Sequence, residues 1–227
     1  MDRSTLASMI DQTLLKPTVG FAGGREWIEA SGNAGFAALC VSPFLVPLAS
    51  QLLAGTTTRV CSVCAFPLGY ANTESKVEEA AHLVALGCHE VDMVLNVAAL
   101  LEGEERFVRD DIEAVVRTVA DTSEGGAIVK VILETGYLDS QTIERACTIA
   151  VEAGAHYVKT STGFGPRGAS IEDVRLMRET VGPDIGVKAA GSIRDLDTAL
   201  AMIEAGADRI GTSSGLEILA ALEARNG

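Results

Sequence analysis

Short apolar runs alternate with longer amphipathic segments along the whole chain. The runs predict eight strands, at residues 10–15, 36–41, 59–65, 90–95, 127–134, 156–161, 185–190 and 208–212. After each run, apolar residues recur with helical spacing and predict helices at 24–34, 43–54, 72–87, 99–120, 140–153, 170–181, 195–206 and 214–225. Such alternation predicts parallel strands joined by crossover helices.

Residues at the segment ends agree with these boundaries. Gly87, Gly154 and Gly206 each stand between a predicted helix and the next strand, where a left-handed residue commonly ends a helix. Asn72 and Ser170 stand at predicted helix starts, where their side-chain oxygens can accept bonds from free backbone amides. Both signals therefore favour the same segmentation.

The number of strand–helix units predicts the fold class. Eight units favour a closed (β/α)8 TIM barrel over an open doubly wound α/β sheet. No GxGxxG dinucleotide fingerprint follows the first strand, which weakens the open alternative. No linker or shift in composition divides the chain, so we expect one domain over residues 1–227.

Four ionisable residues interrupt apolar strand sequences: Asp92, Lys130, Lys159 and Lys188. Helices cover the outside of a barrel and side chains fill its inside, so alternation turns these charges inward. The chain has only five lysines, at positions 16, 76, 130, 159 and 188. Three of them thus stand in strands, although lysine is mostly a surface residue. A buried charge is costly unless it is paired, so these positions need an explanation.

Two interpretations of these charges remain open. In the first, the lysines form internal ion pairs with Asp92 and Glu134 and only stabilise the barrel. In the second, Lys159 and Lys188, on consecutive strands about 4.8 Å apart, share one pocket. Burial and a neighbouring like charge lower the pKa of an amine, and a neutral amine is the nucleophile of Schiff-base chemistry. With Asp92 as proton carrier, this predicts an imine-forming lyase or aldolase without a metal.

The loops after the last three predicted strands are rich in small polar residues. Small residues let backbone amides approach an anion, and this region is a frequent phosphate site in TIM barrels. We therefore predict a phosphate-binding cup and a phosphorylated substrate. Its residues are Thr162, Gly163, Gly191, Ser192, Arg194, Gly211, Ser213 and Ser214.

Charge and composition exclude several other classes. The chain has 31 acidic and 18 basic residues, a net charge of −13 and no basic run, which argues against nucleic-acid binding. No apolar stretch reaches the about 18 residues that suggest a membrane span. The N-terminal residues lack a signal-peptide pattern and the five cysteines are scattered, so we expect reduced thiols and a cytoplasmic location.

No residue pattern predicts a metal site. Cys61 and Cys64 have CxxC spacing, but alternation along a strand places them on opposite faces, as expected for core packing. The three histidines are spread along the chain without metal-ligand spacing. We therefore expect neither a metal nor another cofactor.

Over nearly its whole length, the chain resembles the deoxyribose-phosphate aldolase family. Eight short motifs carry this resemblance, and their combined order is specific for the family although no single motif is. The motifs are IDQTLLKP at 10–17, CVSP at 40–43, FPLG at 66–69, EVDMVLN at 90–96, KVILET at 130–135, VKTSTGF at 158–164, VKAAG at 187–191 and RIGTSSG at 209–215.

The resemblance implies a metal-free class I aldolase that reversibly cleaves 2-deoxy-D-ribose 5-phosphate to D-glyceraldehyde 3-phosphate and acetaldehyde, in deoxyribose-phosphate catabolism. By position, Lys159 matches the imine-forming lysine, Lys188 the lysine that tunes it, and Asp92 the proton-relay acid. The residues that match the pocket lining are Asp11, Cys40 and Lys130, and the predicted phosphate residues fall on the family's phosphate loops. Homodimers are frequent in the family, so a homodimer is expected.

Four positions depart from the commoner family pattern: Gln12, Ala65, Ala98 and Ser192. Gln12 replaces a frequent histidine, and the other three replace glycine. Ser192 matters most, because glycine adopts positive φ freely and serine does not.

Two rival functions are also consistent with the sequence. One is another phosphosugar imine aldolase or a transaldolase on the same barrel, since fold alone does not fix function. The other is a catalytically silent sugar-phosphate binding or regulatory protein. Retention of Lys159, Lys188 and Asp92 argues against the silent protein, because binding alone does not require two buried amines.

Overall fold

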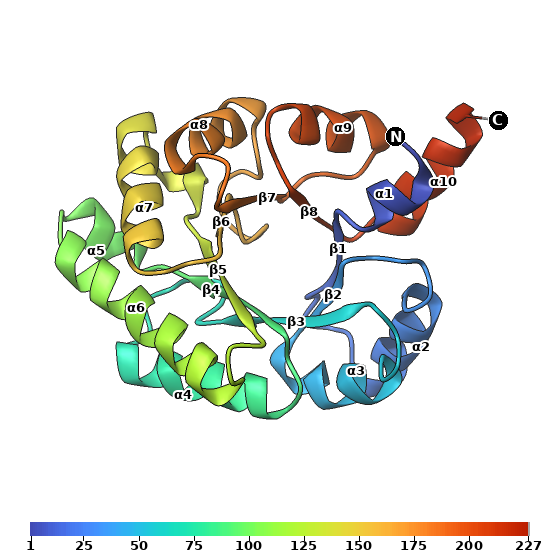
Figure 1. The fold of residues 1–227 in the computed structure, drawn as a ribbon, viewed down its shortest axis with the longest axis horizontal. Coiled ribbons are helices and arrows are strands. Elements are labelled where there is room, and N and C mark those ends of the chain that lie inside the picture. The colour runs from blue at the N-terminus through green and yellow to red at the C-terminus, as the bar shows by residue number, and fades with distance from the viewer. Residues whose placement is uncertain (227) are drawn as a thin grey trace.

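Eight parallel strands pair in sequence order, and β1 pairs with both β2 and β8 to close a barrel (Figure 1). The structure, a computed structural model, describes residues 1–226. The predicted TIM barrel is therefore confirmed. The strands are β1 (Ile10–Leu14), β2 (Ala38–Val41), β3 (Arg59–Cys64), β4 (Glu90–Val94), β5 (Ile128–Ile132), β6 (Tyr157–Lys159), β7 (Gly186–Ala190) and β8 (Arg209–Thr212).

Helices form a ring around the barrel (Figure 1). Two short 3-10 helices, η1 (Pro43–Leu45) and η2 (Thr135–Tyr137), follow strands β2 and β5. The α-helices are α1 (Arg3–Ala7), α2 (Phe21–Ser31), α3 (Val46–Leu52), α4 (Thr73–Ala85), α5 (Val97–Leu101), α6 (Glu105–Thr122), α7 (Ser140–Glu152), α8 (Ile171–Val181), α9 (Leu196–Glu204) and α10 (Gly215–Asn226). Among residues 1–226, none of the helices combines the length and apolar composition that a membrane crossing requires.

The predicted helix ends are confirmed where capping chemistry identified them. The side chains of Asn72 and Ser170 accept bonds from backbone amides three residues ahead. Gly87, Gly154 and Gly206 all have positive φ. The single helix predicted over 99–120 is wrong, because the chain breaks there into α5 and α6 around a left-handed Gly103.

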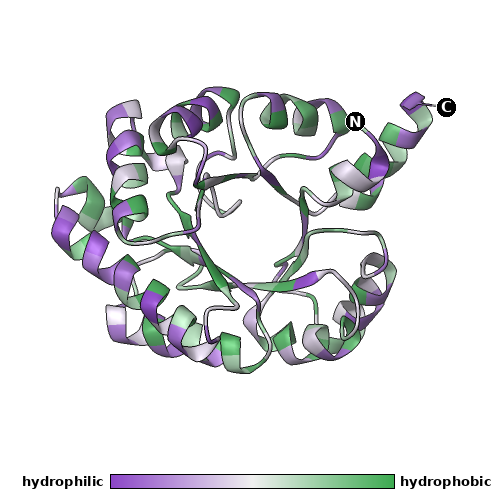
Figure 2. Cartoon of the chain, viewed as in Figure 1, coloured by the Kyte–Doolittle hydropathy of each residue, from purple (hydrophilic) through white to green (hydrophobic). Residues whose placement is uncertain are grey.

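The apolar core lies mainly between the strands and the helices. Outward-facing strand residues such as Val91, Val129 and Val158 are fully buried beneath helices in one large cluster. Figure 2 shows that the helices mix hydrophobic and hydrophilic residues, whereas the strands are largely hydrophobic. A smaller apolar cluster inside the barrel consists of Ala38, Cys40, Cys61 and Val63. It lies beside the inward-facing charged residues of the other strands.

A buried ion pair joins two neighbouring helices outside the barrel. Lys76 Nζ on α4 lies 2.6 Å from Asp111 Oδ2 on α6, and both side chains are at most 1% exposed. Lys76 also donates to the Val94 carbonyl at 3.1 Å, and Thr73 donates to Asp111. This pair connects α4 and α6 to the end of β4, the strand that carries Asp92.

We expect Lys76→Met to lower the free energy of unfolding by about 3–5 kcal/mol, because Asp111 is left charged and unpaired in the core. The double variant Lys76→Met/Asp111→Leu should recover much of this loss. Urea denaturation measures both. As a control, Arg25→Met breaks an exposed pair with Glu29 and should cost about 1 kcal/mol or less. Equal stability of the single and double variants would contradict the interpretation.

Candidate active site

Strand register places the predicted charged residues in two neighbouring pairs inside the barrel. Asp92 on β4 is the register partner of Lys130 on β5, and Lys159 on β6 is the partner of Lys188 on β7. Register partners on parallel neighbours point to the same face of a sheet. The predicted adjacency of the two lysines is therefore confirmed.

Asp92 is the centre of this group. Its Oδ2 accepts hydrogen bonds from Lys159 Nζ and Lys188 Nζ, both at 2.7 Å. Its Oδ1 accepts from Lys130 Nζ at 2.8 Å and from Cys61 Sγ at 3.3 Å. Burial raises the pKa of the Asp92 carboxyl, but the three lysines outweigh burial and hold that pKa well below its usual range. Asp92 is therefore an anion that aligns three amines.

Two more acids and an arginine complete the buried network. Lys188 Nζ lies 2.5 Å from Asp11 Oδ2, and Lys130 Nζ lies 2.6 Å from Glu90 Oε2. Arg209 contacts both acids, at 2.5 Å from Asp11 and 3.3 Å from Glu90. Each buried charge thus has an opposite partner, which the low dielectric of the barrel interior requires.

The carboxylates determine which lysines keep their protons. Burial alone lowers a lysine pKa, but Asp11 and Asp92 outweigh it and raise the pKa of Lys188. Burial also lowers the pKa of Lys130, but Asp92, followed by Asp11 and Glu90, outweighs it and raises that pKa well above its ordinary value. Lys188 and Lys130 therefore stay ammonium ions at neutral pH.

The ion-pair partners differ in part from the sequence expectation. Asp92 pairs with the lysines as expected, but Glu134 does not pair with them and that expectation is wrong. Glu90 and Arg209 were missed, although both stand at the starts of strands. Strand alternation in the sequence could have identified Glu90, because it precedes Asp92 by two residues and so shares its inward face.

A cavity of about 630 Å³ opens above the network, at the carboxyl ends of the strands. Of the three barrel lysines, only Lys159 lines it. Asp11, Cys40, Asp92, Lys130 and Lys188 are fully buried beneath. All eight predicted phosphate residues line the same cavity, namely Thr162, Gly163, Gly191, Ser192, Arg194, Gly211, Ser213 and Ser214.

The loops around this cavity present free amides. Within residues 1–226, the backbone amides of Gly163, Ser192 and Ser213 donate to no other protein group. Gly163 and Gly191 have φ of 87° and 90°. Ser192 adopts φ of 63°, so serine occupies the left-handed conformation at a cost of about 1–2 kcal/mol. Ser192 therefore adopts the left-handed conformation that a glycine would adopt freely.

Gln12 and Ala65, two other departures from the family pattern, are each accommodated by a specific hydrogen bond. Gln12 Oε1 accepts from the Gly215 amide at 2.8 Å, which ties β1 to the start of α10. Ala65 is left-handed, with φ of 52°, and its amide donates to Glu79 Oε2 at 2.7 Å.

Glu134 organises the loop after β6 from the neighbouring strand end. Its carboxylate accepts from the backbone amide of Thr162 at 3.3 Å and from the Thr162 hydroxyl. Glu134 is 2% exposed and left-handed, with φ of 56°. A Cβ on Gly165 would lie 2.8 Å from this carboxylate, so glycine lets the loop close over it. Glu134 thus fixes the loop that carries Thr162 and Gly163.

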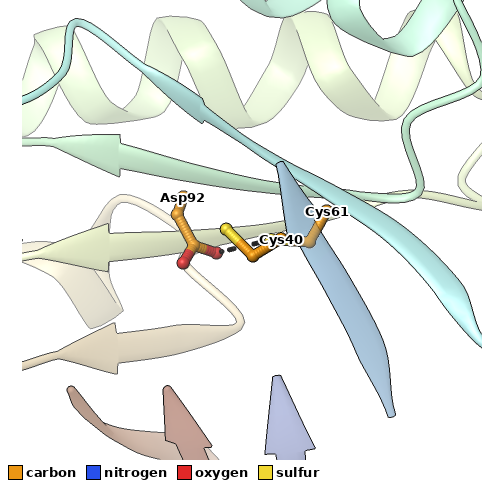
Figure 3. Close-up of side chains that lie close together, drawn as sticks. All are labelled: Cys40, Cys61 and Asp92. Atoms are coloured by element: carbon orange, nitrogen blue, oxygen red, sulfur yellow. Dashed lines mark hydrogen bonds between the residues drawn. The ribbon is translucent and has the colours of Figure 1, made fainter. Parts of the chain in front are cut away.

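Three side chains within the barrel have the donor chemistry of a metal site. Cys40, Cys61 and Asp92 offer two sulfurs and a carboxylate oxygen, all within 4.8 Å of one another (Figure 3). Hydrogen bonding with Cys61 lowers the pKa of the Cys40 thiol, whereas burial raises that of Cys61. Cys64 faces outward, where its Sγ donates to the Lys76 carbonyl, so the predicted opposite orientation of the CxxC pair is confirmed.

Acid should destabilise the fold through Asp11 and Asp92. Burial raises their pKa values, but the surrounding cations outweigh it and hold both below the ordinary 3.8. Unfolding then takes up protons as the pH falls through about 4, so the free energy of unfolding should drop by up to about 2.7 kcal/mol per pH unit from these two groups. Urea denaturation between pH 7 and pH 3 measures the slope.

Two variants distinguish the contribution of this buried network to the pH slope from that of exposed carboxylates. Asp11→Asn should flatten the slope by about 1.4 kcal/mol per pH unit, because one proton is no longer taken up. Asp110→Asn, on the exposed face of α6, should leave it unchanged. Equal slopes in the two variants would contradict the assignment.

Comparison with known proteins places this geometry in a family. The family model described as DeoC/LacD family aldolase matches residues 5–221. A protein of Caldanaerobacter subterraneus subsp. tengcongensis, named deoxyribose-phosphate aldolase, is 50% identical over 214 residues, 94% of this chain and 92% of that protein. Deoxyribose-phosphate aldolase 2 of Bacillus licheniformis is 48% identical over 222 residues, 98% of each chain.

Solved structures agree with the sequence relatives. Deoxyribose phosphate aldolase from Aeropyrum pernix, described as a unique tetrameric structure, has a TM-score of 0.90 and 32% identity, covering 99% of this chain and 93% of that chain. Family match, sequence identity and backbone geometry all extend over nearly the whole chain. The chain therefore belongs to the DeoC/LacD family of aldolases.

Proposed function

We propose that this chain is a deoxyribose-phosphate aldolase that reversibly cleaves 2-deoxy-D-ribose 5-phosphate to D-glyceraldehyde 3-phosphate and acetaldehyde. The carrying observation is the position of Lys159. Its side chain lines the cavity, its Nζ contacts Asp92 at 2.7 Å, and the eight candidate phosphate residues line the same cavity. The names of the Caldanaerobacter and Bacillus relatives support the substrate.

The cup fixes the position of the sugar. Free amides at Gly163, Ser192 and Ser213, with the Arg194 side chain, surround a site suited to a phosphate dianion. The cavity leads from this cup to Lys159. A substrate held by its 5-phosphate can thus direct the C1 aldehyde of its open-chain form at the Lys159 amine.

Bond making begins at Lys159. The neutral amine adds to C1, and the carbinolamine loses water as the Lys188 ammonium donates a proton to the departing oxygen and becomes a neutral amine. The resulting iminium is an electron sink. The C2–C3 bond breaks as the C3 hydroxyl proton passes to Asp92, directly or through water, and glyceraldehyde 3-phosphate leaves. Protonation of the enamine at C2 and hydrolysis then release acetaldehyde.

Asp92 serves as a relay in this scheme. Its pKa is well below the usual range, because the lysines outweigh burial, so it passes a proton on. Lys159 Nζ and Lys188 Nζ share its Oδ2, which gives the proton a short path between them. Neither a metal nor another cofactor has a role in these steps. A role in deoxyribose-phosphate catabolism and assembly as a homodimer stay predictions.

Borohydride reduction in the presence of 2-deoxyribose 5-phosphate should trap a secondary amine on Lys159, located by peptide mass spectrometry. Lys159→Ala should abolish trapping and lower turnover by about a thousandfold or more, because the covalent route is lost. Lys16→Ala, at the cavity rim, is the control and should still be trapped on Lys159.

The same assay distinguishes the rivals. An adduct on Lys130 alone would overturn the assignment of Lys159. Turnover of another phosphosugar but not of this one indicates a different imine aldolase. Tight phosphosugar binding without turnover or adduct indicates a silent binding protein.

Glu134→Ala should raise KM for the phosphorylated substrate by about tenfold, because two hydrogen bonds that hold the Thr162 loop are worth about 1.4 kcal/mol together. The kcat/KM for unphosphorylated 2-deoxyribose should change much less. Glu134→Gln keeps one acceptor oxygen and should recover part of the loss. The exposed Glu144→Gln on α7 is the control. Equal losses on both substrates would contradict a positioning role.

A further inference from the structure

Cys40 and Cys61 form a thiol pair inside the barrel, across two neighbouring strands. The two residues are register partners on β2 and β3, so their side chains point to the same inward face. Both are free thiols and fully buried. Figure 3 shows the Asp92 side chain beside them, and Cys61 Sγ donates to Asp92 Oδ1 at 3.3 Å.

The spacing of these atoms suits one thiophilic cation. The two sulfurs and a carboxylate oxygen of Asp92 all lie within 4.8 Å of one another. Zinc–sulfur bonds of about 2.3 Å let one ion bridge sulfurs up to about 4.6 Å apart, and zinc–oxygen bonds are about 2.0–2.2 Å. Around a tetrahedral ion the two sulfurs lie about 3.8 Å apart, so shifts of at most about 1 Å complete a three-ligand set. Paired thiolates select soft cations.

The charges around the pair are compatible with a bound ion. A divalent cation that replaces two thiol protons forms a neutral unit with the two thiolates, so the net charge of the network is unchanged. The two protons leave to solvent. Lys130 Nζ already lies 3.5 Å from Cys61 Sγ and can donate to the thiolate once it forms. The ion therefore adds no uncompensated charge to the barrel interior.

The pair also lies close to a route from solvent. The half-buried side chains of Leu15 and Phe66 pack against the apolar cluster that contains both cysteines. Leu15 also lines the large cavity. The thiols thus lie one side-chain layer below the cavity, so entry requires movement of side chains and should be slow.

We propose that Cys40 and Cys61, with Asp92 as third ligand, form a site for a thiophilic divalent cation such as Zn²⁺ or Cd²⁺. The bound cation takes an oxygen of Asp92 and thereby disrupts the carboxylate that aligns Lys159, Lys130 and Lys188. The site is inhibitory and is not needed for turnover. The other three cysteines do not join it: Cys64 and Cys88 donate to backbone carbonyls, and Cys147 lies on α7.

Cd²⁺ is the probe, because thiolate-to-cadmium charge transfer gives an ultraviolet absorption that needs no turnover. Wild-type protein with reduced thiols should bind one equivalent slowly and release two protons, followed with a pH indicator. Cys40→Ser and Cys61→Ser should each weaken binding by at least about tenfold, since loss of even an outer-shell partner costs about 10–100-fold. Cys147→Ser, a buried thiol on α7, is the matched control and should bind as wild type does.

Cadmium-113 NMR of the wild type keeps the test independent of variant folding, because the chemical shift reports the number of sulfur ligands. Two sulfurs support the site. One sulfur, no binding to folded wild type, or unchanged binding in both serine variants would overturn it. These readouts are independent of the proposed aldolase activity. Loss of borohydride trapping on Lys159 at one equivalent of Cd²⁺ then links binding to inhibition.

Discussion

The barrel and its candidate site depend on ion pairing between the charged side chains that are buried inside the barrel. Asp92 accepts from three lysines at 2.7–2.8 Å, and all of these groups lie inside a closed sheet with almost no access to water. An unpaired ion there costs several kcal/mol, so the positions of the amines are fixed by carboxylates rather than by packing alone. The pairing that neutralises the interior charges also aligns Lys159 and Lys188 on one oxygen of Asp92. The same ion pairs therefore stabilise the barrel and arrange the candidate site.

Position along the barrel axis separates the roles of these charges. Lys188 and Lys130 lie in the fully buried layer, where Asp11 and Glu90 hold them as ammonium ions. Lys159 reaches the cavity and shares only Asp92 with that layer. Arg209 closes the network from below by contacting both Asp11 and Glu90. Of these amines, the one that lines the cavity is thus also the one with the fewest carboxylate partners.

The loops above the network are shaped by backbone conformation. Ser192 and Ala65 stand where the family usually has glycine, and both adopt positive φ. The Ala65 amide donates to Glu79 Oε2, and Ser192 directly follows a left-handed Gly191. Glu134 and Gln12 then tie the loop after β6 and the start of α10 to neighbouring strands. These bonds and backbone conformations therefore shape the cup.

The sequence by itself determined the barrel and the loops that line the cavity, through its hydrophobic periodicity and the residues at segment ends. It also determined the inward placement of Asp92, Lys130, Lys159 and Lys188. These features depend on local alternation and on glycine positions, which a linear chain records directly. Only the tertiary structure decided the partners: Glu90 and Arg209 as counter-ions, Glu134 as a loop support, and Cys61 beside Cys40 rather than Cys64. Such contacts join residues up to 198 positions apart, as in Arg209 and Asp11. Strand register and barrel closure set them, and neither is visible in the spacing of residues along the chain.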